Sequence, residues 1–373
     1  MSGASPEGTT AYWADRDAPA GHVRTWRGLL VGSVGWGSYL GEVSEEANAA
    51  YEAAAVAAYE SGCNVFDTAS NYRDQQSERD LGGAFAALGP QARDGLVVTS
   101  KAGFLHGDAA AGVPMPDFVR GEYLQPGAIG PDDIVAGCHC LHPAYIVGEL
   151  ERSRANLGLA TLDVFFVHNP ETQLAASVDR ERFYDRLQQT FEALERQVEL
   201  GHIRYYGLAT WDGLRVPPDH PGHLDLANCL ERAAAARRTA FGGDGSDHHL
   251  GAIQLPVNLA MPEAHLVPTQ RGRLGPVPML ELAKEHDLLV LASASLMQTR
   301  IWGQIPEEWS QALETTGDLE TALQFTRSIP GIHTALVGMG QPAHAKENLA
   351  FAARQAPDPK TVSLLLGPGG PHG

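Results

Sequence analysis

The chain has 373 residues, 43% of them hydrophobic, and a formal net charge of −18. This composition supports a sizeable core and excludes wholesale disorder, while the negative charge argues against nucleic acids and anionic membranes as partners. We expect a cytoplasmic protein, because cysteines are sparse, no apolar run approaches the roughly 20 residues that span a bilayer, and the amino end lacks a secretory signal.

Strand and helix patterns alternate eight times along the chain. The first apolar run, Gly28–Val34, is expected to be the first strand, and a glycine-broken turn, Gly35–Tyr39, follows it. Ser44, with two glutamates after it, is typical of a helix start, and Gly62 ends that helix. Further apolar runs predict strands at Cys63–Asp67, Leu96–Lys101, Asp163–His168, Ile203–Ala209, Ala252–Val257, Leu288–Ala292 and Thr334–Val337. Helical patterns lie at Ala144–Leu157, Arg182–Leu200, Leu224–Arg238, Pro278–His286, Leu319–Ser328 and Gln341–Arg354.

These units predict a closed (β/α)8 barrel, the TIM barrel of the α/β class. The strands are nearly continuous apolar runs, as a sheet covered on both faces requires. An open doubly wound sheet is the competing architecture, but no GxGxxG motif follows the first strand. We expect residues 1–26 to form a tail or a cap on the barrel bottom, residues 27–355 the barrel, and residues 356–373 a tail.

Three predicted connections are too long to be simple turns. They cover residues 104–142, 259–275 and 295–318, and each follows a predicted strand. Loops longer than about 12–15 residues are usually functional or disordered. We therefore expect them to rise on the rim where barrel enzymes place their chemistry and to wall a substrate pocket.

Four polar residues lie at or just past the carboxyl ends of three consecutive predicted strands: Asp67, Tyr72, Lys101 and His168. A tyrosine has an unperturbed pKa of about 10 and must become a better acid to protonate a carbonyl oxygen. A nearby ammonium stabilises the phenolate, and a carboxylate keeps a buried lysine charged. The four residues predict a carbonyl-reducing site, with Tyr72 as the acid and His168 holding the carbonyl oxygen or assisting the proton transfer.

The chain resembles the aldo-keto reductase superfamily in three places: the segment Asp67–Tyr72 (DTASNY), the strand-end Lys101, and the turn His168–Pro170. The stretch Gly201–Gly207 (GHIRYYG) also matches, and the resemblance extends over roughly residues 27–351. It implies a barrel oxidoreductase that binds a nicotinamide cofactor without a Rossmann fold. Tyr72 would be the general acid, with Lys101 and Asp67 tuning it.

The resemblance also implies a set of cofactor contacts. They are Gly37, Ser38 and Asp67 near the nicotinamide, Gln254 on its carboxamide, Thr210 after the fifth strand, Ser293 where a stacking tyrosine is usual, Leu296 and Gln298 at the pyrophosphate, Gly338 and His344 at the 2′-phosphate, and Glu347 and Asn348 in the last helix. Thr210 and Ala209 replace the family's Ser-Asn pair, and of the two only Thr210 can hydrogen-bond through its side chain. Family habit favours NADP(H), but Gly338 and His344 replace the usual cations, so NAD(H) stays open.

The expected substrate is a carbonyl or alcohol of a small metabolite. Residues expected to line its pocket are Trp36, Tyr39, His139, His142 and Trp211. The Cys138–His142 segment (CHCLH) carries zinc-type ligands, but its spacing does not fit a zinc site, and no metal is predicted. An NAD-linked sugar dehydrogenase and a non-catalytic, cofactor-binding regulatory subunit remain alternatives. The sequence does not reveal the oligomeric state.

Overall fold

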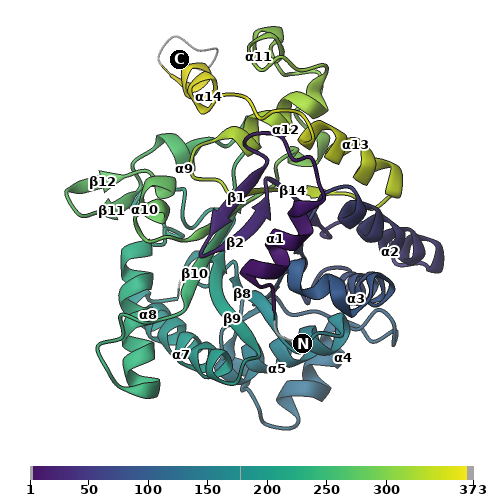
Figure 1. Cartoon of the computed structure of the whole chain (residues 1–373). Helices are drawn as coiled ribbons and strands as arrows, with labels where there is room; N and C mark the ends of the chain where they lie inside the picture. Colours follow the sequence, from purple (N-terminus) through teal and green to yellow (C-terminus); the bar gives the residue numbers. More distant parts are fainter. Residues whose placement is uncertain (1–2, 177, 368–373) are drawn as a thin grey trace.

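A closed barrel of eight parallel strands forms the centre of the molecule (Figure 1). The computed structural model describes residues 3–176 and 178–367. In barrel order the strands are β3 (Val34–Gly37), β4 (Val65–Asp67), β5 (Val97–Ala102), β8 (Leu162–His168), β9 (Ile203–Ala209), β10 (Leu250–Pro256), β13 (Leu289–Ser293) and β14 (Thr334–Gly338). The predicted (β/α)8 architecture is confirmed.

One helix follows each barrel strand and packs outside the barrel (Figure 1). These helices are α2 (Glu45–Glu60), α3 (Gln76–Leu88), α5 (Pro143–Leu157), α7 (Arg180–Glu199), α8 (Leu226–Phe241), α10 (Met279–Glu285), α12 (Asp318–Ser328) and α13 (Pro342–Ala352). Ser44 caps α2 as expected, because its hydroxyl accepts a hydrogen bond from the Ala47 amide at 3.1 Å.

The prediction of the first barrel strand is wrong. Most of the run Gly28–Val34 forms β2 (Leu29–Gly32), which pairs with β1 (Val23–Trp26) in an antiparallel hairpin. Arg27 and Gly28 both have positive φ, as a two-residue hairpin turn requires. The run is apolar because the hairpin packs on the inner core of the barrel. The first barrel strand is β3, which lies mostly in the segment expected to be a turn. Two glycines in β3 interrupt the apolar run by which a strand is predicted.

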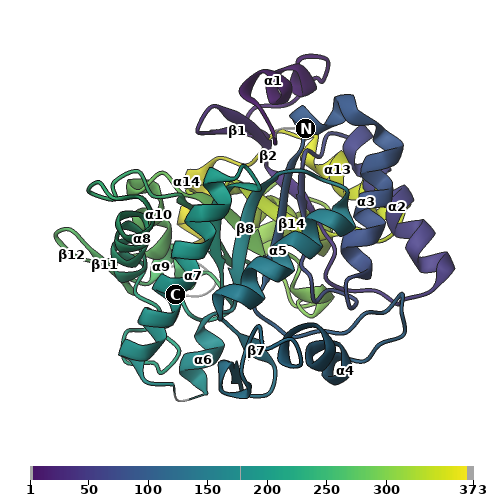
Figure 2. The same ribbon diagram turned by 90° about the horizontal axis from the view of Figure 1, so that it is seen from below.

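The two ends of the barrel differ in what covers them (Figure 2). Helix α1 (Pro6–Ala14) and the β1–β2 hairpin lie at one end. At the other end lie α4 (Met115–Val119), α6 (Glu171–Ala175) and β7 (His139–Cys140). This second end carries the carboxyl ends of the barrel strands, so it is the end where chemistry is expected.

The long connections contain structure of their own. Residues 104–142 include α4, a π-helical turn at Arg120–Leu124 and the hairpin of β6 (Ile134–Val135) with β7. Residues 259–275 and their flank form α9 (Glu263–Leu266) and the hairpin of β11 (Gln270–Gly272) with β12 (Gly275–Val277). Residues 295–318 include α11 (Glu307–Ala312).

The expected C-terminal tail is helical in part. Helix α14 (Pro359–Leu366) contacts α12 and buries Val362. The last six residues, 368–373, lie outside the described part of the chain. No described helix is both long enough and apolar enough to cross a membrane.

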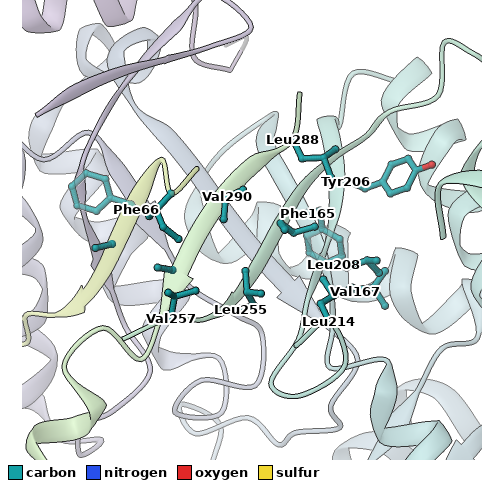
Figure 3. Packing of buried hydrophobic residues seen from close by; sticks show 14 of the residues in the cluster. Phe66, Phe165, Val167, Tyr206, Leu208, Leu214, Leu255, Val257, Leu288 and Val290 are labelled. Carbon is teal, nitrogen blue, oxygen red and sulfur yellow. The ribbon is translucent and has the colours of Figure 1, made fainter. Parts of the chain in front are cut away.

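Buried side chains form two layers that alternate along each strand. Residues between the strands and the outer helices include Phe66, Phe165 and Tyr206 (Figure 3). Their strand neighbours, such as Val65 and Val164, fill the barrel interior. Because side chains along a strand alternate between its two faces, this division fixes which residues point into the barrel.

Candidate active site

Strand alternation turns the last polar side chains of three neighbouring strands into the barrel. Val65 belongs to the inner layer and Phe66 to the outer layer, so Asp67 at the end of β4 points inward. The same alternation turns Lys101 of β5 and His168 of β8 inward. The expected strand-end residues therefore meet at one rim.

Asp67 is the centre of a buried polar network. Its Oδ1 accepts hydrogen bonds from Thr99 Oγ1 at 2.7 Å and from Gln254 Nε2 at 2.8 Å, across the barrel on β10. Its Oδ2 accepts from Lys101 Nζ at 2.7 Å. Lys101 Nζ also donates to the carbonyl of Thr68 at 2.6 Å. The lysine is fully buried, so its charge depends on these acceptors.

The pKa of Lys101 is set by two opposing effects. Burial lowers it below the ordinary value, because an ammonium loses its hydration inside the barrel. The carboxylate of Asp67 opposes this through its charge and its hydrogen bond, and Glu78 adds a further raising effect.

Tyr72 follows β4 and lies above this pair. Lys101 Nζ is 4.7 Å from the centre of its ring. The ring meets Tyr39 edge-on at 5.0 Å and His168 edge-on at 5.8 Å between ring centres. Among the described residues no group hydrogen-bonds to the Tyr72 hydroxyl, so this oxygen is free to meet a ligand.

The pKa of Tyr72 differs from the sequence-based expectation. This pKa lies well above 10, first because the ring is buried and second because the charge of Asp67 disfavours a phenolate, and Tyr39 adds a further charge effect in the same direction. Lys101 was expected to lower this pKa, but its ammonium is held at 2.7 Å by the Asp67 carboxylate. The phenol therefore holds its proton firmly in the protein alone.

His168 is buried at the rim and has a pKa well below 6.5, first because of burial and then because of the charges of Lys101 and His139. Its Nδ1 has no hydrogen-bond partner among the described residues. Its backbone carbonyl accepts a hydrogen bond from His139 Nε2 at 2.8 Å. The ring of Phe104 lies edge-on to both imidazoles. A neutral imidazole at this place can donate one hydrogen bond and accept another.

Several residues expected at the cofactor lie at the same rim with unused polar atoms. Thr210 Oγ1, after β9, and Asn348 Oδ1, on α13, are buried and have no partner among the described residues. Ser38 behaves differently, because its buried hydroxyl already donates to Thr68 Oγ1 at 2.9 Å. The amide of Gln254 is likewise bound to Asp67.

The remaining expected cofactor residues lie on the outer part of this rim. Gly37 ends β3, Ser293 ends β13 and Gly338 ends β14. Leu296 is half-buried after β13, whereas Gln298, Gly338, His344 and Glu347 are exposed. Gln341 caps α13 without a side-chain bond, so the first amides of this helix are not satisfied by a cap.

The predicted substrate-pocket residues divide into two groups. Tyr39 and Trp211 are exposed on rim loops, and Tyr39 contacts Tyr72. Trp36 is wrong as a pocket residue: it lies on the outer face of β3, is fully buried, and donates to the Met339 carbonyl at 2.9 Å. Because the first barrel strand is β3 and not the run Gly28–Val34, the Trp36 side chain points toward α2.

The two loop histidines predicted to line the pocket have structural partners. His139 is fully buried behind His168, and burial lowers its pKa to about 4. His142 caps α5, where its Nδ1 accepts from the Ala144 amide at 3.2 Å. His139 therefore does not form an open pocket wall, whereas His142 lines a surface cavity together with Gln173 and Arg186. Within the described residues no group of three or more His, Cys, Asp or Glu side chains is arranged to hold a metal.

Sequence reasoning missed Thr99 and Phe104. Thr99 lies two residues before Lys101 on the same strand face, so strand alternation could have found it. Phe104 lies in the long loop after β5, where no periodic pattern indicates which side chain turns toward the site.

The fold and the rim chemistry define a TIM-barrel enzyme. The family described as "Aldo/keto reductase family" matches residues 29–216, half of the chain. The chain therefore belongs to this family and is an oxidoreductase. Compared with curated proteins by sequence, it has no match.

Solved structures with the same fold include other aldo-keto reductases. An enzyme from Klebsiella pneumoniae, in complex with NADP and acetate, is 20% identical, has a TM-score of 0.59, and is matched over 93% of this chain and 94% of that chain. The enzyme AKR11C1 from Bacillus halodurans, in its holo form, is 17% identical, has a TM-score of 0.58, and is matched over 92% and 95%. Identities this low support the fold alone.

Proposed function

We propose that the protein is an NADP(H)-dependent oxidoreductase that transfers hydride between nicotinamide and a carbonyl or alcohol of a small metabolite, with Tyr72 as general acid and base. The observation that carries this proposal is the free Tyr72 hydroxyl above the buried Lys101–Asp67 pair, with Lys101 Nζ 4.7 Å from the ring centre. A reducing cytoplasmic location accords with four free cysteines.

The unused polar atoms of the rim fit a nicotinamide cofactor. Thr210 and Asn348 each keep one buried polar oxygen that bonds to none of the described residues. A buried polar atom without a partner is costly, so a ligand that bonds to it is favoured. The nicotinamide, when bound, supplies or accepts the hydride. These rim residues and Gln254 would hold its ring and amide.

The protein groups handle the proton that accompanies hydride transfer. In the reducing direction Tyr72 gives its hydroxyl proton to the carbonyl oxygen as negative charge develops there. The phenolate left behind is stabilised by the ammonium of Lys101, which Asp67 keeps ionised. His168, with a free Nδ1 and a depressed pKa, hydrogen-bonds the substrate oxygen as a neutral imidazole.

The 2′-phosphate of NADP has no fixed cation at Gly338 or His344. The uncapped amides at the start of α13 supply an anion site instead. NADP in the Klebsiella pneumoniae relative favours the phosphorylated cofactor. The missing cations favour the second candidate, an NAD-linked sugar dehydrogenase. Fluorescence-quenching titrations separate the two, because a strong NADPH preference rules the second candidate out.

Replacement of Tyr72 by Phe tests the proposed role directly. We expect Tyr72→Phe to lower kcat by about 100-fold or more, within the range for removal of a positioned acid, while the Kd for NADPH changes little. Turnover is measured by NADPH absorbance across a panel of aldehydes, ketones and sugars. Near-normal turnover of the variant would refute the acid assignment. Tight cofactor binding by the wild-type protein without any turnover would instead support a regulatory subunit.

A further inference from the structure

Three consecutive residues directly after Tyr72 have a left-handed backbone. The φ angles of Arg73, Asp74 and Gln75 are 51°, 48° and 74°. Residues other than glycine rarely adopt this conformation, and a run of them is strained. Such strain persists only where the surroundings hold it in place, and it concentrates at functional sites.

The side chain of Arg73 is held by four hydrogen bonds and one ring contact. Its Nε and Nη2 donate to the carbonyl of Glu42 at 3.0 and 2.5 Å, and its Nη1 donates to Asp80 Oδ2 at 2.5 Å. Nη2 also donates to Asn48 Oδ1 at 2.5 Å, and the guanidinium lies 4.3 Å from the centre of the Tyr51 ring. The side chain is only 2% exposed. All the contacts lie on the loop after β3 or on the helices α2 and α3.

Asp74 and Gln75 hold the other side of the turn. Asp74 Oδ1 accepts from the Gly107 amide at 2.9 Å, and its carbonyl accepts from the Ala109 amide at 3.1 Å. Gln75 Nε2 donates to the Gly107 carbonyl at 2.9 Å. The turn therefore joins two rim loops, one after β3 and one after β5, at the residue that follows Tyr72.

The Arg73 contact with Glu42 also bears on Tyr39. Glu42 and Tyr39 share the short loop after β3, and the Tyr39 ring packs edge-on against Tyr72. Two nitrogens of the Arg73 guanidinium donate to the Glu42 carbonyl. This pair of bonds sets both the distance and the orientation of the loop relative to Arg73. Arg73 thereby fixes the two segments next to the Tyr72 ring: the turn that follows Tyr72 in the chain and the loop that contains Tyr39.

We propose that Arg73 is a positioning residue, which clamps the left-handed turn and the Tyr39 loop so that the Tyr72 hydroxyl stays aligned for proton transfer. This inference rests on the proposed function of Tyr72. Arg73 itself touches no reacting atom. It acts by restricting the tyrosine to one orientation over Lys101.

The first test variant is Arg73→Lys. It keeps a positive charge beside Asp80, but a single ammonium cannot reproduce the forked bonds to Glu42 together with the bond to Asn48. The second is the double variant Arg73→Gln, Asp80→Asn, which removes both charges and leaves no unpaired buried carboxylate. The matched control is Arg232→Lys, whose arginine lies on α8 and pairs with Glu181 and Asp185 of α7, on the outside of the barrel.

The assay uses the carbonyl compound that the wild-type protein reduces best, with NADPH as cofactor. We expect both test variants to lower kcat by about 10- to 100-fold, as misplacement of a reacting group by about 1 Å does. The melting temperature and the Kd for NADPH should stay near wild type. The primary isotope effect with NADPH deuterated at the transferred hydrogen should rise, because the chemical step becomes slower.

Two results would overturn the inference. One is an unchanged kcat in both variants, and the other is a loss of kcat that only follows the loss of folded protein or of cofactor binding. Tyr72→Phe, measured alongside, separates the causes: if it is inactive while the Arg73 variants are normal, only the positioning role fails. If Tyr72→Phe is active, or if the wild-type protein reduces nothing, the proposed function fails and the inference with it.

Discussion

Asp67 illustrates how much of the site depends on single atoms. Its two oxygens accept from Thr99, Lys101 and Gln254, so one carboxylate joins three strands of the barrel. A change that keeps the shape of this side chain but removes its charge therefore isolates the electrostatic part of its role.

Asp67→Asn should weaken both stability and turnover. The new amide group faces Lys101 Nζ, leaving a buried ammonium without a countercharge. Breaking such a pair costs about 3–5 kcal/mol. The free energy of unfolding, from urea titration, should fall by this amount, and kcat should fall with it. Asp287→Asn is the control, because its ion pair is 68% exposed on the aspartate side and contributes about 0–1 kcal/mol. Equal losses in the two variants would contradict the prediction.

At the scale of elements, most of the fold could be predicted from the sequence and most of the loop structure could not. Apolar runs such as Ile203–Ala209 coincide with their strands, because a buried parallel strand needs little more than hydrophobicity and length. The prediction of the first strand failed because β2 is as apolar as a barrel strand, while Gly35 and Gly37 weaken the strand pattern of β3. Gly35 is needed there, since a Cβ would lie 2.7 Å from Thr334.

The candidate site follows the same division. Asp67, Lys101 and His168 could be predicted because each lies at or next to the end of a strand, where the direction of the side chain is defined. Loop residues depend on contacts between distant segments, such as those of Gln75 with Gly107 and Asn156, which no local pattern encodes. The charged groups at the strand ends were therefore predictable, whereas the loop contacts that hold the rim around them were not.

The loop after β5 contains a buried histidine, His106, whose protonation should make the stability of the folded protein depend on pH. His106 Nδ1 lies 2.8 Å from the Gly107 carbonyl and Nε2 lies 2.5 Å from Glu149 Oε2. Both nitrogens face acceptors, so the imidazolium suits the place, and Glu149 raises the pKa of His106 above 6.5 against the effect of burial. This contribution to stability is complete below pH 6.5 and is lost as the pH rises through the raised value.

His106→Gln should remove this pH dependence. Between pH 6 and pH 9 the unfolding free energy of the wild-type protein should decline relative to that of the variant. Urea titrations at several pH values measure the difference. His142→Gln is a suitable control, because that histidine caps a helix and pairs with no carboxylate in the described structure. A constant difference between wild type and His106→Gln across this range would show that the pair does not titrate.

The β1–β2 hairpin is expected to stabilise the barrel without contributing to catalysis. Trp26 is 1% exposed, donates from Nε1 to the Asp287 carbonyl at 3.0 Å, and packs on Tyr205. Trp26→Ala should lower the free energy of unfolding by about 3–5 kcal/mol. Because Tyr72 lies at the other end, kcat of the folded fraction should stay unchanged. Leu274→Ala, at a residue 99% exposed, should change stability by less than about 0.5 kcal/mol.

At the scale of the whole molecule, the eight strands turn separate local signals into one site. Asp67 on β4 and Gln254 on β10 lie across the barrel from each other and are bonded at 2.8 Å. A ligand at this rim touches loops from many strands, so its binding should stabilise the entire fold.

Cofactor binding should therefore raise the melting temperature of the intact protein. A ligand at 100 times its Kd stabilises the native state by about 2.7 kcal/mol. We expect NADPH to give a larger shift than NADH at equal concentration, measured by differential scanning fluorimetry. Added salt should reduce the difference, because the 2′-phosphate contact is electrostatic. A larger shift with NADH would favour the NAD-linked alternative.

Trp26, Leu29 and Val31 of the β1–β2 hairpin pack against the inner core and close one end of the barrel. Whatever reacts beside Tyr72 must arrive and depart through the same mouth. The reactant that binds deeper in the barrel can leave only after the one bound nearer the opening. The two reactants should therefore bind and dissociate in a fixed order. The turnover rate would then depend on product and cofactor release as much as on the chemical step.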